Sequence, residues 1–177
     1  MDVRVATDAD VPALHRLVER AYRGDVAKQG WTHEADLLDG QRTDAPMLAA
    51  MIADAEGTVL LAEVAGQLVG SVHIQRIREG CAYLGMLSVD PERQDGGIGR
   101  QLIDAGEQLA IDHFGCTHME MSVIAQRSEL IDYYVRRGYA ETGETRPFPY
   151  EDQRLGTARS RDLEFIIMAK TLRSPMP

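Results

Sequence analysis

Hydrophobic and polar residues follow two different periods along this chain. Between residues 11 and 22 the apolar positions recur every three or four residues, which predicts an amphipathic helix. A short apolar run at 3–6 predicts a strand before it. Residues 58–64 and 67–77 are apolar runs of strand length, and Ala65-Gly66 between them is typical of a tight hairpin turn.

The second half of the chain continues with strands and helices in turn. An apolar strand pattern at 83–89 leads into a glycine-rich turn and then into a helix, in which Ile98, Leu102, Ala105 and Leu109 share one face. Further strands are expected at 117–124, 139–145 and 163–170, with a helix at 127–137. No repeat, low-complexity tract or linker divides the chain, so we expect one domain over residues 1–177.

The turn after residues 83–89 has the composition of an anion-binding site. Pro91 ends the strand because it has no N–H for the sheet, and Gly96, Gly97 and Gly99 follow just before the helix. The first N–H groups of a helix lack intrahelical partners, and glycines let a phosphate approach the backbone. The spacing matches neither a P-loop, since no lysine follows, nor a dinucleotide-binding fingerprint.

A second motif ends the helix expected at 127–137. Tyr134 is followed four residues later by Gly138, which is expected to adopt the left-handed conformation that closes a helix. Tyr139 then begins the next strand. Taken together, Gln94-x-x-Gly97-x-Gly99 resembles the pyrophosphate loop of the GNAT acetyltransferase superfamily, and the second motif resembles the later tyrosine motif of the same family.

This resemblance implies a fold and an activity. The fold would be α/β, with a mixed, mostly antiparallel sheet of about six to seven strands that splays beside the glycine loop, flanked by about four helices. The cosubstrate would be acetyl-CoA, without a metal, and the enzyme would be an N-acetyltransferase acting on a primary amine of a small molecule or peptide. Direct attack by the amine is expected, because no cysteine nucleophile with a paired histidine is evident.

The resemblance also assigns roles to residues. The main chain of Leu87, Ser88 and Val89 would pair with the pantetheine arm of coenzyme A, and a bulge in this strand would aim an N–H at the thioester carbonyl. Tyr134 would contact the cofactor and protonate the departing thiolate; the alternative is a tyrosine that only packs on the core. The Arg100 side chain also fits an ordinary exposed helix position. The residues around the pyrophosphate would be Gln94, Asp95, Gly96, Gly97, Ile98, Gly99 and Arg100.

The chain departs from the family pattern at two positions. Arg127 stands where members often carry an asparagine that contacts the cofactor, although an arginine can still contact pantetheine or phosphate. Ser122 stands where some members carry a glutamate base, and a serine cannot replace that base by itself. Glu120, two residues earlier on the same strand face, is our candidate base, and a solvent-facing strand glutamate is an equally good interpretation. Tyr83 and Glu34 are weaker substitutes, and proton removal through water is a further alternative.

Two other functional classes stay open beside the acetyltransferase, and the departures at Arg127 and Ser122 favour the first of them. One is an acyl-CoA-binding sensor module without turnover. The other is a domain without enzymatic activity that uses the glycine loop for a different phosphate ligand or partner.

The polar segment 24–43 carries the only tryptophan of the chain, Trp31. A polar loop with an aromatic residue often carries recognition, so we expect Trp31, Glu34 and Tyr83 to contact the acceptor amine. An equally good interpretation is that Trp31 anchors the loop to the core. The local structure expected here is a short helix at Leu37-Leu38 and a helix cap at Thr43 or Asp44.

Composition narrows the range of possible partners. The 19 Lys and Arg against 28 Asp and Glu leave a formal net charge of -9, which argues against non-specific nucleic-acid binding and is compatible with a cationic or amine substrate.

The cysteines and the apolar segments bear on the compartment. Cys81 and Cys116 begin expected strands, where buried free thiols of a reducing compartment are common. No stretch resembles a transmembrane helix or a signal peptide, so we expect a cytoplasmic protein without a membrane partner. A homodimer is left open, and the identity of the acceptor amine is not readable from this sequence.

Overall fold

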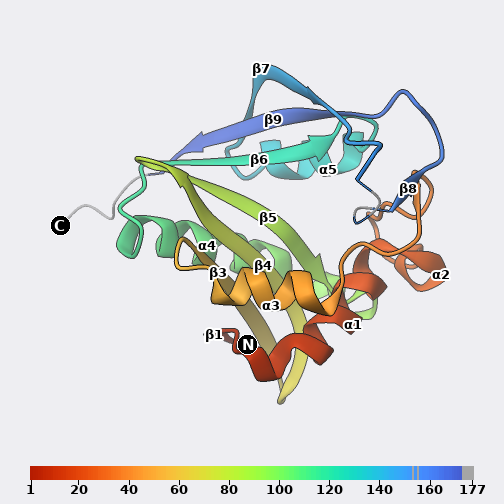
Figure 1. Ribbon diagram of the computed structural model, residues 1–177. Helices are drawn as coiled ribbons and strands as arrows, with labels where there is room; N and C mark the ends of the chain where they lie inside the picture. The colour runs from red at the N-terminus through yellow and green to blue at the C-terminus, as the bar shows by residue number, and fades with distance from the viewer. Residues whose placement is uncertain (153, 155, 173–177) are drawn as a thin grey trace.

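The computed structural model describes residues 1–152, 154 and 156–172, and its centre is a seven-stranded mixed sheet (Figure 1). The strand order is β1-β3-β4-β5-β6-β9-β7, and neighbours are antiparallel except for the parallel pair β5 and β6. The predicted fold is therefore confirmed. The strands of this sheet are β1 (Asp2–Val5), β3 (Gly57–Val64), β4 (Gln67–Arg78), β5 (Cys81–Val89), β6 (His118–Ile124), β7 (Ala140–Pro147) and β9 (Glu164–Thr171).

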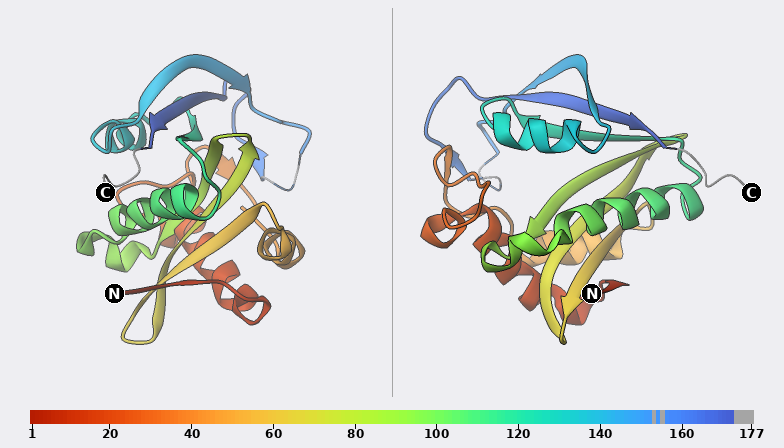
Figure 2. Two further views of the ribbon diagram at one scale, coloured as in Figure 1. Left: turned by 90° about the vertical axis from the view of Figure 1, so that its left-hand side faces the viewer. Right: turned by 180° about the vertical axis from the view of Figure 1, so that it is seen from behind.

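Helices cover both faces of the sheet, as the views from the front and from behind show (Figures 1 and 2). Two short 3-10 helices at Asp8–Asp10 and Pro91–Gly96 precede α1 and α4, and no helix in the described residues is long and apolar enough to cross a membrane. On one face lie α1 and α3, and on the other lie α4 and α5. The helices are α1 (Val11–Tyr22), α2 (Gly24–Ala27), α3 (Ala45–Ala53), α4 (Ile98–Asp112) and α5 (Ser128–Val135).

The apolar run of β3 explains why two cores exist. Successive residues of a strand point to opposite faces, so Val59 and Leu61 pack with α1 and α3, whereas Leu60 and Ala62 pack with α4. All four residues are buried. A strand that is covered on both faces needs a continuous apolar run rather than strict alternation, and this is what the sequence of β3 contains.

The sheet opens between β5 and β6, and this opening positions the site described below. The two strands pair only at their first three positions, from Cys81 opposite His118 to Tyr83 opposite Glu120. Beyond Tyr83 they diverge, while β6 remains paired with β9 as far as Ile124 (Figure 2). The splay expected beside the glycine loop is therefore present, and it leaves one edge of β5 without a neighbouring strand in the described residues.

Two local expectations have a definite outcome. The short helix expected at Leu37-Leu38 is wrong, because Leu38 and Asp39 form strand β2, which pairs with β8 (Thr157–Ala158). The distant connection that supplies β8 overrides the local helical pattern, and the Leu38 side chain is buried in a third cluster with Phe148. Of the two expected caps, Asp44 begins α3, with its carboxylate accepting from the Met47 N–H at 2.7 Å.

Candidate active site

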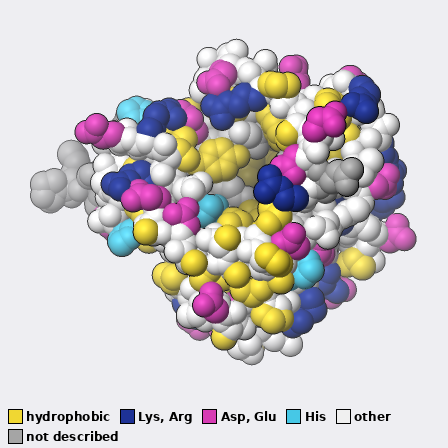
Figure 3. All heavy atoms as spheres, in the orientation of Figure 1, with side chains coloured by type: hydrophobic (Ala, Val, Ile, Leu, Met, Phe, Trp, Pro, Cys, Tyr) yellow, Lys and Arg dark blue, Asp and Glu magenta, His cyan; other side chains and the backbone are white. Residues whose placement is uncertain are grey.

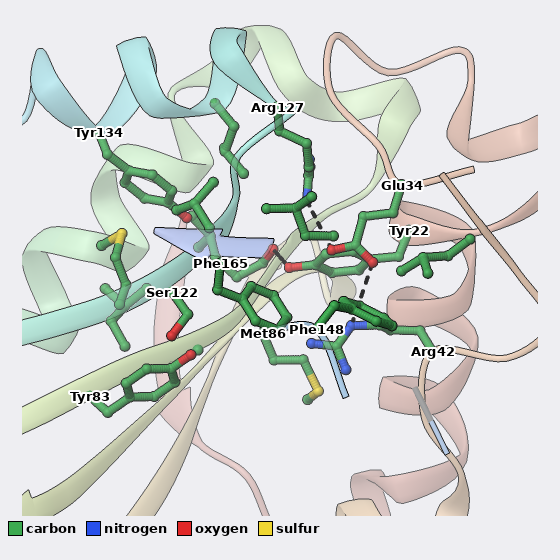
Figure 4. Close-up of a pocket in the computed structure, with 18 of the residues that line it drawn as sticks. Tyr22, Glu34, Arg42, Tyr83, Met86, Ser122, Arg127, Tyr134, Phe148 and Phe165 are labelled. Atoms are coloured by element: carbon green, nitrogen blue, oxygen red, sulfur yellow. Dashed lines mark hydrogen bonds and ion pairs between the residues drawn. The ribbon is translucent and has the colours of Figure 1, made fainter. Parts of the chain in front are cut away.

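Two cavities meet where β5 and β6 diverge, and Figure 4 shows the larger of them. The larger has a volume of about 300 Å³ and the smaller of about 130 Å³. The surface is hollowed over this part of the molecule, with hydrophobic side chains inside the hollow and basic side chains beside it (Figure 3). The residues that line both cavities are Tyr22, Leu87, Arg127, Leu130 and Tyr134.

The smaller cavity is built on the glycine loop. Gly97 has a φ of +66°, a left-handed conformation that strains any other residue, and it is the residue directly before α4. A Cβ on Gly99 would lie 2.8 Å from the Tyr133 hydroxyl oxygen, so a side chain at this position would have to displace the end of the Tyr133 side chain. The 15-residue helix α4 presents its first N–H groups here. The loop therefore has the geometry of an anion site, and Leu87, Val89, Gln94, Gly97 and Gly99 line it as expected.

Other residues predicted for the cofactor lie elsewhere. Ile98 and Ser88 are buried away from both cavities, and the Ser88 hydroxyl donates to the Met86 carbonyl at 3.1 Å. Ile98 and Ser88 could therefore contact the cofactor only through backbone atoms. Arg100 is exposed beside Asp104 at 3.7 Å, which favours the interpretation as an ordinary helix residue. Gly96 lies outside both linings, and the side chain of Asp95 is outside the described part of the structure.

Trp31, which was expected to contact the acceptor, lines the smaller cavity and not the larger one. Its backbone N–H donates to Gln94 Oε1 at 2.8 Å, and its ring lies 4.9 Å from the ring of Tyr133. These two contacts fix the Trp31 loop against the glycine loop and α5. Glu34 and Tyr83, in contrast, line the larger cavity.

Tyr134 separates the two cavities. Gly138, with a φ of +88°, closes the end of α5 as expected, and the Tyr134 ring packs edge-on against Tyr133 and Tyr139. Its hydroxyl makes no hydrogen bond to any described residue, whereas the Tyr139 hydroxyl donates to Glu107 at 2.9 Å. Burial raises the pKa of Tyr134 well above its ordinary value. The Tyr134 phenol is therefore protonated at neutral pH, with its oxygen directed into the cavity (Figure 4).

A bulge in β5 lies at the junction of the cavities. Between the pairs Ser71–Ser88 and His73–Gly85, β5 has one more residue than β4, and Met86 takes a φ of +50°. Such a bulge turns the following residues of the strand. The Tyr22 hydroxyl donates to the Leu87 carbonyl at 2.6 Å and holds this segment in place. The resemblance predicted a bulge here, and the strand has one.

A buried cluster of charges forms one wall of the larger cavity. The Glu34 carboxylate accepts from Arg23 Nη1 at 2.6 Å and from Arg127 Nη1 at 3.0 Å, and Arg42 Nε lies 3.9 Å away. Burial alone would raise the pKa of Glu34, but the charges of Arg127, Arg42 and Arg23 outweigh it and hold that pKa below its ordinary value. Glu34 is therefore ionised and engaged by arginines, which makes it a poor proton acceptor.

Tyr22, Arg23 and Arg42 were not expected at the site. Arg23 directly precedes the polar segment 24–43 that was singled out for recognition and Arg42 lies within it, and this was the available signal. Arg127 was expected to contact the cofactor, and it does line the smaller cavity. Its guanidinium, however, also binds Glu34 and donates to the Thr32 hydroxyl at 2.8 Å.

Glu120, the candidate base, lines neither cavity. It lies opposite Tyr83 at the last paired position of β5 and β6, whereas Ser122 lies beyond the point where the strands part and lines the larger cavity. The Glu120 carboxylate is paired with Arg78, and the hydrogen bond between them lowers the pKa of Glu120. The structure therefore gives the prediction of Glu120 as base no support. Glu120 stands on β6 before the point where the strands part, outside the opening.

Comparison with known proteins identifies the family. The chain matches the model of the acetyltransferase (GNAT) family over residues 12–139. A mycothiol acetyltransferase of Salinispora tropica is 34% identical over 137 residues, which are 75% of this chain and 42% of that protein, so the chain spans less than half of that relative's length.

Solved structures share the fold. Ribosomal-protein-alanine N-acetyltransferase from Brucella melitensis has a TM-score of 0.71 at 22% identity, covering 97% of this chain and 100% of that one. A GNAT family acetyltransferase from Elizabethkingia anophelis with acetyl-CoA bound has a TM-score of 0.67 at 14% identity, covering 97% of each. Because the family model matches more than half of the chain, this protein belongs to the acetyltransferase (GNAT) family.

Proposed function

We propose that this protein is an N-acetyltransferase that moves the acetyl group of acetyl-CoA to a primary amine by direct attack. The observation that carries the proposal is the position of Tyr134, whose buried side chain lines both cavities. One cavity lies on an anion-binding glycine loop, and the other is large enough for a small acceptor. Family membership and a fold neighbour with acetyl-CoA bound support the same conclusion.

The residues of the smaller cavity fit coenzyme A. Gly97, Gly99 and the first N–H groups of α4 would hold the pyrophosphate, and the Tyr133 side chain, which lies against Gly99, would border it. The edge of β5 beyond Tyr83 would pair with the pantetheine arm, as an extended peptide adds to an open sheet edge. Trp31, Tyr133 and Arg137 form the outer side of the same cavity. When bound, acetyl-CoA supplies an acetyl thioester activated toward amines.

The protein's own residues position the acceptor amine and supply a proton to the departing thiolate. The acceptor amine occupies the larger cavity, close to the bulged segment of β5, which orients it toward the junction. Tyr134 holds its proton because burial raises its pKa, and it gives this proton to the departing sulfur. Among the described residues Glu34 is the only carboxylate that lines the larger cavity, and it is engaged by arginines. Water therefore takes the proton from the amine.

The contiguous cavities favour an enzyme over a sensor. A module that only binds acyl-CoA has no need of a second cavity joined to the first at the position of the thioester. For the compartment we propose the cytoplasm, which is supported by two buried cysteines that form no disulfide. The homodimer stays a prediction, which sedimentation analysis would check.

The test measures thiol release from acetyl-CoA across a panel of primary amines, together with calorimetric binding of acetyl-CoA, ATP and NAD. We expect binding of acetyl-CoA alone and turnover with at least one class of amine. Gly99→Glu adds bulk and negative charge at the start of α4 and should abolish acetyl-CoA binding. Gln101→Glu is the matched control, because it places the same charge on the exposed side of the same helix. Wild-type affinity in a folded Gly99→Glu variant would contradict the proposed cofactor site.

A further inference from the structure

The walls of the larger cavity carry an excess of positive charge. Of the described residues that line it, four are charged: Arg23, Arg42, Arg127 and Glu34. Three cations thus face one anion, in a chain whose formal net charge is -9. Burying cations without a full complement of anions is unfavourable, so an anionic ligand in this cavity would be stabilised.

The four charged side chains differ in how many hydrogen bonds they make. Both Glu34 oxygens are bound, one by Arg23 and one by Arg127, and Arg127 also donates to Thr32. Arg42 lies at the edge of the cluster, with its guanidinium 5.2 Å above the Tyr22 ring and its side chain 21% exposed. Within the described residues the Arg42 guanidinium donates no hydrogen bond, and its approach to Glu34 is 3.9 Å. Its N–H groups are therefore available to a ligand.

The close-up shows how an acceptor could span the cavity (Figure 4). Tyr83, Ser122 and Tyr134 present hydroxyls from one side, and Arg42 extends from the other. Met86, Phe148 and Phe165 line the cavity with apolar surface. A ligand that suits this arrangement has an amine near Tyr134, an apolar body and an acidic group at Arg42.

We propose that the acceptor is a primary amine that also carries a carboxylate, and that Arg42 binds this carboxylate. The inference rests on the proposed function and adds the substrate class. A planar guanidinium binds a carboxylate through two parallel N–H bonds, which fixes the orientation of the ligand. Short apolar peptides and ω-amino acids share this chemistry, because their amine and carboxylate lie at opposite ends of an apolar body. Polyamines do not, because their additional positive charges would face the arginines.

The same excess charge favours the reactive form of the amine. A nearby positive charge disfavours an ammonium group, and the amine must lose its proton before it attacks. The arginine cluster thus assists deprotonation in a cavity whose one carboxylate, Glu34, is already ionised and paired. The carboxylate of the ligand offsets part of the cluster's charge and keeps binding favourable.

The experiment compares matched acceptors with the full chain and acetyl-CoA. The dipeptide Phe-Ala is compared with its C-terminal amide, and 6-aminohexanoic acid is compared with 6-aminohexanamide and with hexylamine. Spermidine represents the polyamines. Thiol release gives kcat/KM, and calorimetry in the presence of coenzyme A gives binding without turnover.

We expect the carboxylate-bearing amines to exceed their amides by roughly 10- to 100-fold in kcat/KM, the usual value of a charge-assisted hydrogen-bonded pair. Arg42→Gln should abolish the advantage of the acids over their amides, mainly through the KM of the acids. Arg16→Gln is the matched control, since Arg16 is exposed on α1 and lies outside the cavity.

Each outcome decides the inference. Amides, hexylamine or spermidine reacting as well as the acids would overturn it and leave the proposed acetyltransferase activity intact. Acids that neither bind nor react would also overturn it. Carboxylate-dependent binding that Arg42→Gln abolishes, without thiol release from any amine, would support the Arg42 site and reject the proposed activity.

Discussion

The Tyr22 hydroxyl donates a hydrogen bond of 2.6 Å to the carbonyl oxygen of Leu87. Tyr22 is the last residue of α1, and Leu87 follows the bulge of β5, so this bond joins a helix end to the strand at the junction of the two cavities. Arg42 and Arg127 lie 5.2 and 5.9 Å from the centre of the same ring. One side chain thus connects the strand edge proposed for the acetyl donor with the cations that face the acceptor.

Replacing Tyr22 by Phe tests this connection. The ring and its cation contacts stay, and the loss of one hydrogen bond should lower the free energy of unfolding by about 1 kcal/mol. We expect a fall of roughly tenfold in kcat, because the bulged segment loses its fixed position. Tyr150→Phe is the control: outside both cavities, the Tyr150 hydroxyl donates to the Leu163 carbonyl at 3.2 Å and accepts from the Leu163 N–H at 2.8 Å. In thermal denaturation Tyr150→Phe should lose at least as much stability as Tyr22→Phe, whereas only Tyr22→Phe should lose turnover.

Replacing Tyr134 by Phe tests whether the Tyr134 hydroxyl protonates the departing thiolate. Acetyl-CoA should bind nearly as before, since the ring and its packing are kept, and turnover should fall by roughly 10²–10⁴. Tyr139→Phe is the comparison, because it also removes a buried hydroxyl but one that is bonded to Glu107 and lines neither cavity. A Tyr134→Phe enzyme with wild-type turnover on a good substrate would show that water or another group protonates the thiolate.

The pH dependence follows from the same residue. Because burial raises the pKa of Tyr134 above its ordinary value, the phenol keeps its proton at every pH below about 10. The rate should rise with pH as the acceptor amine loses its proton and should show no alkaline decline below that point. A decline below pH 9 that disappears in Tyr134→Phe would contradict the raised pKa.

Replacing Trp31 by Ala distinguishes the two cavities. Since Trp31 contacts Gln94 and Tyr133 at the smaller cavity, the variant should lose acetyl-CoA affinity, while the KM for the amine should change little. Calorimetry with acetyl-CoA and steady-state kinetics with the amine measure the two effects. A raised amine KM with unchanged acetyl-CoA affinity would instead favour the acceptor role expected from the sequence.

Replacing Glu34 by Gln removes the anion of the arginine cluster. Loss of one partner from a buried ion pair costs about 3–5 kcal/mol, so urea unfolding at pH 7 should show a large destabilisation. The pKa of Glu34 is below its unfolded value, so its stabilisation is fully present above that unfolded value, about 4.3, and is lost as pH falls through the folded pKa. The difference between wild type and variant should therefore shrink in acid. A difference that is independent of pH would contradict the lowered pKa.

The acidic composition and the cavity illustrate how global and local charge can differ. A net charge of -9 is compatible with a cationic substrate, yet the larger cavity carries an excess of arginine. Net charge describes the field at a distance, which salt screens, whereas recognition depends on the groups within a few ångströms of the ligand. The distribution of charge over the fold therefore decides which acceptor the cavity prefers.

The sequence by itself determined the features that depend on neighbouring residues. Gly97 and Gly138 take the left-handed conformations expected of them, and the apolar spacing of α4 and β3 places their residues against the core. Steric restriction of φ and ψ and the periods of helix and strand act within a few residues, so a reader of the sequence can apply them. Leu37-Leu38 is the local pattern that failed, because pairing with the distant β8 outweighed it.

The tertiary structure alone decided which chemistry-bearing side chains meet. Arg23, Glu34 and Arg42 come from the connection after α1, and Arg127 from the start of α5, yet they form one buried cluster. Glu120 and Ser122 share a strand face, but only Ser122 lies beyond the point where β5 and β6 part. Charge pairing and cavity shape depend on distances between elements far apart in the chain, and no local pattern encodes those distances.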